Sequence, residues 1–212
     1  MVPLAGALAS LGAGGALLTA GCTEPRSPAV GRRFEDRFER AELGPDWRVT
    51  GEGWRVEGGA LRGQGVRNHP LWLRRKLPRD ARIEFDAWSD SPAGDLKCEA
   101  WGDGSSHAVQ ASYTATSYVV IFGGWNNSYN VIARMDEHAP DRRQRVGPRV
   151  EMGRHYHFTI ERRGRVLRWL LDGAPMLEWD DPDPLAGPGH EYFAFNDWDA
   201  VVHFDNLVIT PL

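Results

Sequence analysis

The chain has 212 residues, of which 25% are charged, and its formal net charge is −4. This slight acidity gives no reason to expect nucleic acid as a partner, because proteins that bind DNA or RNA concentrate positive charge. The length suffices for one domain with a sizeable core, and the high counts of glycine (24) and proline (14) favour short strands joined by turns.

The N-terminal segment, residues 1–21, has no charged side chain and contains an apolar run of small residues from Leu4 to Leu18. This run is too short for a permanent membrane helix and is typical of an export signal. It ends in Leu-Thr-Ala-Gly before Cys22, which resembles the lipobox of bacterial lipoproteins. We therefore expect residues 1–21 to be a signal peptide and Cys22 to be lipidated. A plain secretory signal cleaved near Ala20, or a disordered tail, is the alternative.

The expected mature protein is exported to the cell envelope, facing the periplasm or the cell surface, and it contacts the membrane through the lipid anchor only. Residues 22–33 contain Pro25, Pro28 and Gly31 with few apolar side chains, which indicates a flexible tether to a domain over residues 34–212. If Cys22 carries lipid, Cys98 has no disulfide partner. The alternating apolar neighbours of Cys98 predict a buried thiol.

Beyond residue 33 the apolar side chains recur with a period of two rather than 3.6, which is typical of strands and leaves no convincing helix. Gly-Gly at 58–59, Arg-Gly at 163–164 and Asp-Gly at 172–173 are hairpin turns. Residues 136–154 form the longest irregular stretch, which at that length is functional or mobile. The pattern predicts an all-β sandwich or barrel. The expected strands are residues 34–38, 47–50, 54–57, 60–63, 71–77, 81–88, 96–102, 117–122, 129–135, 156–163, 166–172, 176–179, 192–196 and 201–209.

Three segments resemble concanavalin A-like sandwich domains. Residues 54–61 (WRVEGGAL) match the opening W-x-V-x-x-G-x-L, residues 166–179 resemble the late hairpin, and residues 202–209 (VHFDNLVI) resemble the last strand, V-x-F-D-N-L-x-I. The resemblance spans residues 34–212 and implies an antiparallel two-sheet jelly-roll sandwich. The superfamily includes laminin-G-type modules, family 16 glucanases and bacterial domains called 3-keto-disaccharide hydrolases. An oligo- or polysaccharide is therefore the expected partner, although a fold does not fix a function.

Two expected strands carry acids followed by a tryptophan on the face away from the core. These are Glu84, Asp86 and Trp88 in residues 81–88, and Glu99 and Trp101 in residues 95–103. If the two strands are neighbours, they form an acidic patch with an aromatic wall. Such a surface suits a sugar, because tryptophan stacks on a pyranose while carboxylates bond to hydroxyls. An ordinary solvated sheet face explains the same pattern equally well.

A second candidate lies between residues 122 and 138, where polar and aromatic side chains follow two glycines. They are Trp125, Asn126, Asn130, Arg134 and His138. Asn130 and Arg134 share one face of the expected strand 129–135 and could hold an oxygen-rich ligand. The alternative is a plain hairpin in which Trp125 covers the sheet edge.

The turn before the last strand reads Asn196-Asp197-Trp198-Asp199. Asn196 and Trp198 could line the same cleft as the residues around Trp125. Asp197 and Asp199 make a bound calcium ion possible, although the spacing of an EF-hand is absent from the sequence. We expect no other metal and no organic cofactor.

Family 16 glucanases carry Glu-x-Asp-x-(x)-Glu on one strand, and the nearest match here is Glu84-Phe85-Asp86-Ala87-Trp88-Ser89, without the second glutamate. A different pair, such as Asp86 with Glu99, could still act if the carboxyl groups lie about 5–5.5 Å apart for retention or about 6.5–9.5 Å apart for inversion. Three functions stay open: a tethered saccharide-binding or sugar-processing-associated protein, a glycoside hydrolase or lyase using Glu84, Asp86 and Glu99, and a structural envelope module that binds protein.

Overall fold

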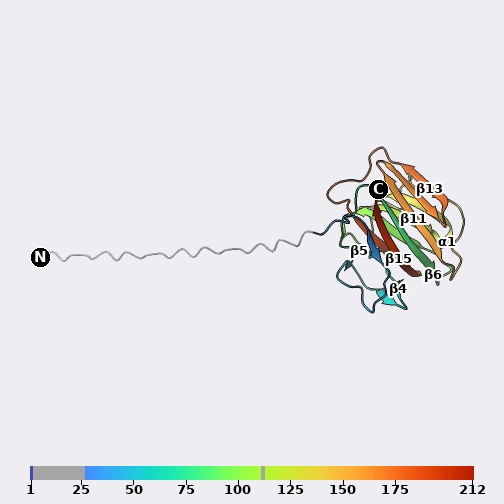
Figure 1. Ribbon diagram of the computed structural model, residues 1–212, viewed down its shortest axis with the longest axis horizontal. Coiled ribbons are helices and arrows are strands. Elements are labelled where there is room, and N and C mark those ends of the chain that lie inside the picture. The colour runs from blue at the N-terminus through green and yellow to red at the C-terminus, as the bar shows by residue number, and fades with distance from the viewer. Residues whose placement is uncertain (2–26, 111–112) are drawn as a thin grey trace.

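The computed structural model describes residue 1, residues 27–110 and residues 113–212 (Figure 1). The expected signal peptide, Cys22 and the first part of the expected tether lie outside the described residues. Within the described part of the chain, no helix has the length and apolarity needed to cross a membrane.

Regular structure consists almost wholly of strands, as the period-two pattern predicts. All the expected strands form, most of them with shifted ends; the strand expected at 71–77, for example, ends at Leu73. A short strand within residues 136–154 and the four-residue helical segment α1 (Gly124–Asn127) were not expected. The strands are β1 (Phe34–Asp36), β2 (Trp47–Val49), β3 (Trp54–Glu57), β4 (Ala60–Gln64), β5 (Leu71–Leu73), β6 (Ala81–Ser89), β7 (Leu96–Gly102), β8 (Tyr118–Gly123), β9 (Tyr129–Arg134), β10 (Arg143–Arg145), β11 (Tyr156–Arg163), β12 (Val166–Leu171), β13 (Ala174–Asp180), β14 (Tyr192–Asn196) and β15 (Val201–Pro211).

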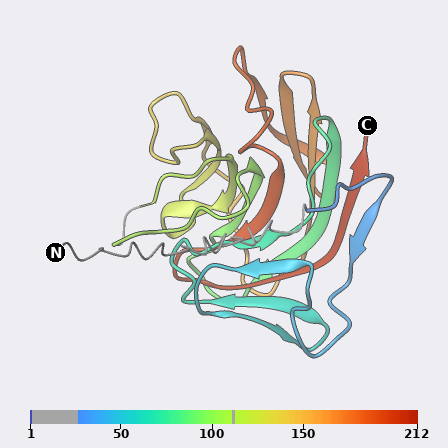
Figure 2. The ribbon, with the colours of Figure 1, turned by 90° about the vertical axis from the view of Figure 1, so that its left-hand side faces the viewer.

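Two antiparallel sheets pack against each other, which confirms a jelly-roll-like sandwich and excludes a closed barrel. The eight-stranded sheet has the order β13-β12-β11-β6-β15-β4-β3, and β1 also pairs with β15. The seven-stranded sheet has the order β10-β9-β8-β7-β14-β5-β2. In Figure 2, the long strand β15, drawn in red, curves across the molecule.

The core lies between the sheets and is rich in aromatic rings. The ring of Phe85 on β6 is stacked 4.8 Å from Phe158 in its own sheet and meets Phe195 of the opposite sheet edge-on at 5.2 Å. Phe195 is stacked in turn on Phe204 of β15, at 4.3 Å. Offset and edge-to-face pairs of this kind add stability beyond the burial of their area. These contacts fix which side of each strand faces inward.

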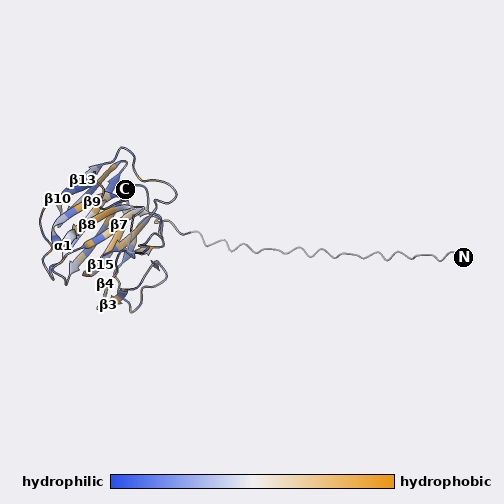
Figure 3. Cartoon of the chain, turned by 180° about the vertical axis from the view of Figure 1, so that it is seen from behind, coloured by the Kyte–Doolittle hydropathy of each residue, from blue (hydrophilic) through white to orange (hydrophobic). Residues whose placement is uncertain are grey.

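Two strands of the seven-stranded sheet, β8 and β9, carry apolar side chains on both faces. Val120 and Phe122 of β8 belong to the main core, whereas Val119 and Ile121 belong to a second buried cluster on the opposite face. Figure 3 shows the resulting hydrophobic colouring of β7, β8 and β9. The outward side chains of β8 and β9 are therefore mostly buried rather than in contact with water.

The folded domain begins earlier than residue 34. The backbone N–H of Val30 donates to the carbonyl of Lys76 (2.9 Å), and the N–H of Lys76 donates to the carbonyl of Pro28 (3.0 Å). Val30 is buried. Residues 28–30, which we expected to be part of the tether, thus pair with the domain.

Candidate functional site

The strands β6 and β7 lie in opposite sheets and are not neighbours. β6 pairs with β11 and β15, and β7 pairs with β8 and β14. Ile83 of β6 and Cys98 of β7 both point into the shared core. Glu84 and Asp86 therefore lie on one outer face of the sandwich and Glu99 on the other. The expected acidic patch across the two strands, and the pairing of Asp86 with Glu99, are wrong.

Trp88 lies on the outer face of the eight-stranded sheet, between two imidazole rings. Its ring centroid is 4.1 Å from that of His155 and 4.8 Å from that of His203, with nearly parallel planes. Because both faces of the indole are covered, Trp88 cannot stack on a sugar in this arrangement.

The carboxylates on the same face have partners of their own. A ring nitrogen of His157 lies 2.7 Å from Asp86 Oδ1, and Asn206 Nδ2 donates to Asp86 Oδ2 at 2.9 Å. The other ring nitrogen of His157 lies 3.8 Å from Glu84. Glu84 and Asp86 thus belong to a polar network across neighbouring strands.

Trp101 is a core residue and not part of an outward aromatic wall. It is 1% exposed, and its indole N–H donates to the carbonyl of Pro78 at 3.0 Å. The alternation of β7 breaks here, because Trp101 has a left-handed φ of 58° and the register shifts between Tyr192 and Phe193 on the paired strand. A bulge of this kind re-aims a side chain, so Ala100 and Trp101 both face the core.

Asn130 and Arg134 share a face, as predicted, but it is the inner face of β9, on which Ile132 enters the main core. The side chain of Asn130 is buried; it accepts the N–H of Gly123 (2.9 Å) and donates to the carbonyl of Pro148 (2.9 Å). Arg134 lies 3.3 Å from Asp181. Both residues therefore stabilise the sheet through these contacts and do not line the cavity.

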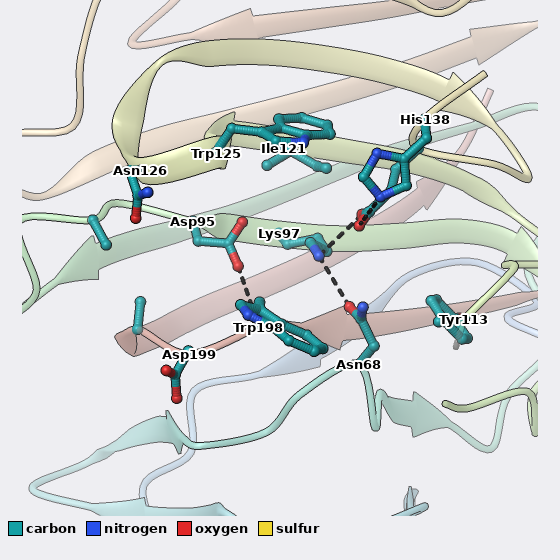
Figure 4. A pocket seen from close by; sticks show the side chains of 13 residues that line it. Asn68, Asp95, Lys97, Tyr113, Ile121, Trp125, Asn126, His138, Trp198 and Asp199 are labelled. Atoms are coloured by element: carbon teal, nitrogen blue, oxygen red, sulfur yellow. Dashed lines mark hydrogen bonds and ion pairs between the residues drawn. The ribbon is translucent and has the colours of Figure 1, made fainter. Parts of the chain in front are cut away.

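A cavity of about 580 Å³ opens on the outward face of the seven-stranded sheet (Figure 4). This volume lies within the range of about 300–1,000 Å³ that is usual for small-molecule sites. Four of the expected ligand residues line it, namely Trp125, Asn126, His138 and Trp198. The other polar side chains on its wall are Asn68, Asp95, Lys97, Tyr113, Glu137 and Asp199.

The segment that presents Trp125 and Asn126 is strained. Both residues have left-handed φ, at 51° and 55°, a conformation that costs about 1–2 kcal/mol for a residue other than glycine. The neighbouring Asn127 holds the segment through a reciprocal pair of hydrogen bonds: its Oδ1 accepts the N–H of Val150 (2.8 Å) and its Nδ2 donates to the carbonyl of Val150 (2.7 Å). Asn130 holds the preceding Gly123. These bonds offset the strain and fix Trp125 at the pocket.

Trp198 comes from the turn before β15, which packs on a second turn. The N–H of Arg67 donates to the carbonyl of Trp198 (2.7 Å), and the N–H of Asn68 donates to that of Asp197 (2.9 Å). The N–H of Trp198 donates to Asp95 Oδ2 at 2.7 Å. The indole is 43% exposed at the wall of the cavity, so it can still stack on a ligand.

Lys97 lies at the centre of the polar wall, with a side chain only 2% exposed. Its Nζ donates to Asn68 Oδ1 at 3.0 Å and lies 3.1 Å from Glu137 Oε2. Burial acts against the charge, but the carboxylates of Asp95, Glu137 and Asp197 outweigh it and raise the pKa of Lys97 above its ordinary value. The ammonium group is therefore held charged in the pocket wall.

Asp197 is buried next to this group. Burial, with the nearby carboxylate of Asp95, raises the pKa of Asp197 well above its ordinary value. Its Oδ2 atom is buried without a hydrogen-bond partner among the described residues, while Oδ1 accepts the N–H of Ala200 at 3.3 Å. Asp95 and Asp197 thus place two interacting carboxyl groups at one end of the site.

Glu99 lies beneath the pocket and is fully buried. It accepts hydrogen bonds from Tyr113 (2.6 Å), Asn196 (2.8 Å) and Ser117 (2.6 Å). Burial raises the pKa of Glu99 to about 7, and the three donors and Lys97 limit the rise. Glu99 and Asn196, both expected at the site, therefore support its wall from behind, and Tyr113 connects Glu99 to the cavity.

Metal binding has no support in the described part of the chain, where no group of three or more histidine, cysteine, aspartate or glutamate side chains is placed to hold an ion. The two aspartates that the sequence suggested as calcium ligands, Asp197 and Asp199, lie in different surroundings. Asp197 is buried, whereas the side chain of Asp199 is 60% exposed and lies 3.7 Å from Arg67.

Five of the polar residues that line the cavity were not among the predicted site residues. Asp95 and Lys97 belong to the outward face predicted for residues 95–103, and Glu137 adjoins His138, so the pattern contained a signal for these three. Asn68 and Tyr113 come from loops, where no periodicity marks a side chain as pocket-facing.

No protein-family model matches the chain, and no curated protein matches it by sequence. Solved structures do share its fold. The carbohydrate-binding module CBM66 from Bacillus subtilis aligns with a TM-score of 0.61 at 15% identity, over 80% of this chain and 98% of that one. A prokaryotic β-1,3-1,4-glucanase (lichenase) derived from a mouse hindgut metagenome aligns with a TM-score of 0.59 at 8% identity, over 85% of this chain and all 100% of the other.

A third similar structure is the carbohydrate recognition domain of Emp47p, with a TM-score of 0.56 at 12% identity, over 85% of this chain and 95% of that one. At such low identities the likeness shows the fold alone. The expected two-sheet jelly-roll sandwich is thereby confirmed as the fold, which this chain shares with the three structures.

Proposed function

We propose that the protein is a saccharide-binding module whose ligand occupies the cavity on the outward face of the seven-stranded sheet. One observation carries the proposal: two tryptophans from separate turns, Trp125 and Trp198, border an open cavity whose wall also carries several polar and charged side chains. In Figure 4 their indole rings lie on opposite sides of Lys97. A sugar ring has an apolar face that stacks on indole and hydroxyl groups that need such polar partners.

The carboxyl groups that the sequence suggested for catalysis do not meet at the cavity, which removes the expected basis for hydrolysis. A glycosidase needs two carboxyl groups beside one bond of the substrate. Glu84 and Asp86 lie on the far side of the sandwich, and Glu99 is buried behind the pocket wall with three hydrogen bonds. A structural envelope module with a flat surface would have every tryptophan buried, so the partly exposed Trp198 at the cavity argues against that function.

The carbohydrate-binding and glucanase names of similar structures also support a saccharide ligand. We further propose that the protein is exported and lipid-anchored through Cys22, which rests on the sequence of residues 1–22. On this view the lipid tethers the binding module to the bacterial envelope.

A glycan microarray probed with the full chain tests the proposed function, followed by incubation of each hit in solution and analysis of the products. We expect at least one oligo- or polysaccharide to bind and to be recovered intact. Absence of binding across the array would refute the saccharide-binding function. Shortened products would show that the protein is a hydrolase or lyase instead.

A further inference from the structure

The wall of the cavity carries more acidic than basic side chains. Among the described residues on its wall, Lys97 is the one lysine or arginine, whereas Asp95, Glu137 and Asp199 supply carboxyl groups. Asp199 lies 3.7 Å from Arg67 and can be set aside as a compensated charge. Asp95 and Glu137 then face the ligand, and Lys97 is the one basic lysine or arginine beside them among the described residues of the wall.

The charge of Lys97 is already engaged by the protein. Its Nζ lies 3.1 Å from Glu137 Oε2 and 3.0 Å from Asn68 Oδ1, and its side chain is 2% exposed. Buried ammonium groups have this kind of close carboxylate partner because an unpaired buried charge is strongly unfavourable. A ligand carboxylate or sulfate approaching Lys97 would therefore meet the negative charge of Glu137 at the same point.

One arginine close to the cavity, Arg142, already has partners of its own. Arg142 donates to the backbone carbonyl of Glu137 (2.8 Å) and to Gln144 (2.9 Å), and its guanidinium group lies over the ring of Trp125 at 4.7 Å. The imidazole of His138 lies 3.7 Å from Glu137, so it shares the carboxylate that already holds Lys97.

From this arrangement we infer that the site takes uncharged saccharides and rejects those that carry a carboxylate or sulfate group at the bound residue. The inference rests on the proposed function and specifies its ligand class. Hydroxyl groups can both accept from Lys97 and Asn68 and donate to Asp95 and Glu137, whereas an anionic group can only accept. Repulsion between the carboxylates of the site and an anionic ligand weakens the binding of that ligand relative to a neutral one.

Matched pairs of saccharides test the inference on the full chain, within a broad panel of neutral and anionic glycans. The pairs are lactose-terminated glycans with and without a terminal sialic acid, and oligogalacturonates with free or methyl-esterified carboxyl groups. We expect the hits of the panel to be neutral. Wherever a pair binds, the anionic member should bind at least about tenfold more weakly, which corresponds to about 1.4 kcal/mol.

The variant Glu137→Gln should reduce the difference in affinity between the neutral and the anionic member of a pair, because it removes the carboxylate next to Lys97 and leaves the ammonium available to an anion. Glu84→Gln, on the opposite face of the sandwich, is the matched control and should leave this difference unchanged. Equal or tighter binding of an anionic glycan, lost when its carboxyl groups are esterified, would overturn the inference while leaving saccharide binding intact. A panel without any hit would refute the proposed function itself.

Discussion

Burial raises the pKa of Glu99 from the ordinary 4.5 to about 7. The stability of the folded protein should therefore depend on pH. Between these two values the folded protein keeps a proton that the unfolded chain has lost. Stability therefore falls as the pH rises through this window. Each pKa unit is equivalent to about 1.4 kcal/mol, so ionisation of Glu99 lowers the free energy of unfolding by about 3 kcal/mol at pH 8 relative to pH 4.

The variant Glu99→Gln removes this titration while keeping the size of the side chain. The amide oxygen can still accept from Tyr113 and Asn196, and the amide nitrogen can donate to the hydroxyl of Ser117, which is able to accept as well as donate. The variant should therefore fold and become more stable relative to the wild type as the pH rises, by about 2–3 kcal/mol between pH 5 and pH 8.

Urea denaturation of both proteins at pH 5 and pH 8, followed by tryptophan fluorescence, measures the difference. If the free energies of unfolding of the two proteins differ by the same amount at both pH values, then burial does not perturb Glu99 in the way described. A variant that is less stable at pH 8 than at pH 5, relative to the wild type, would reverse the sign and refute the reasoning outright.

Three further predictions concern single residues. Trp101→Ala should lower the free energy of unfolding by about 3–5 kcal/mol, because the indole fills the core; a change below about 1 kcal/mol in urea denaturation would place it at the surface. In a Cys22→Ser background, Cys98 should resist a thiol reagent until denaturant is added, since burial raises the pKa of its thiol well above the ordinary value; rapid labelling of the folded protein would contradict this. In its native host, Cys22→Ser should move the protein out of the membrane fraction, and unchanged partitioning would argue against a lipid anchor.

The fold was predictable because turn residues and alternating side chains follow directly from local geometry. Residues 54–57, 96–102, 156–163 and 192–196 form strands with the predicted ends. Strand partners were not predictable, because alternation describes one strand and does not say which strand lies beside it. The strands containing Glu84 and Glu99 are consecutive in the chain, yet the connection between them passes from one sheet to the other.

Two properties of the candidate site limited its prediction. The first is that β9 is buried on both faces: Val131 belongs to the outer apolar cluster and Ile132 to the main core, so the sequence could not tell which face carries Asn130. The second is the left-handed backbone of Trp101, which turns inward a side chain that strict alternation places outside. By contrast, Trp125 and Trp198 lie in turns rich in asparagine, glycine and aspartate, and such composition does mark exposed, functional loops.

A comparison of two tryptophan variants tests the saccharide-binding site most directly. Trp198→Ala removes an exposed indole from the pocket wall, whereas Trp88→Ala removes an indole from the opposite face, where it lies between His155 and His203. Titration of the same neutral glycan hit into each folded variant should give a dissociation constant at least about tenfold higher for Trp198→Ala, equivalent to about 1.4 kcal/mol, and an unchanged value for Trp88→Ala. Wild-type affinity in Trp198→Ala would contradict the proposed site, and loss of affinity in Trp88→Ala alone would place the ligand on the other face of the sandwich.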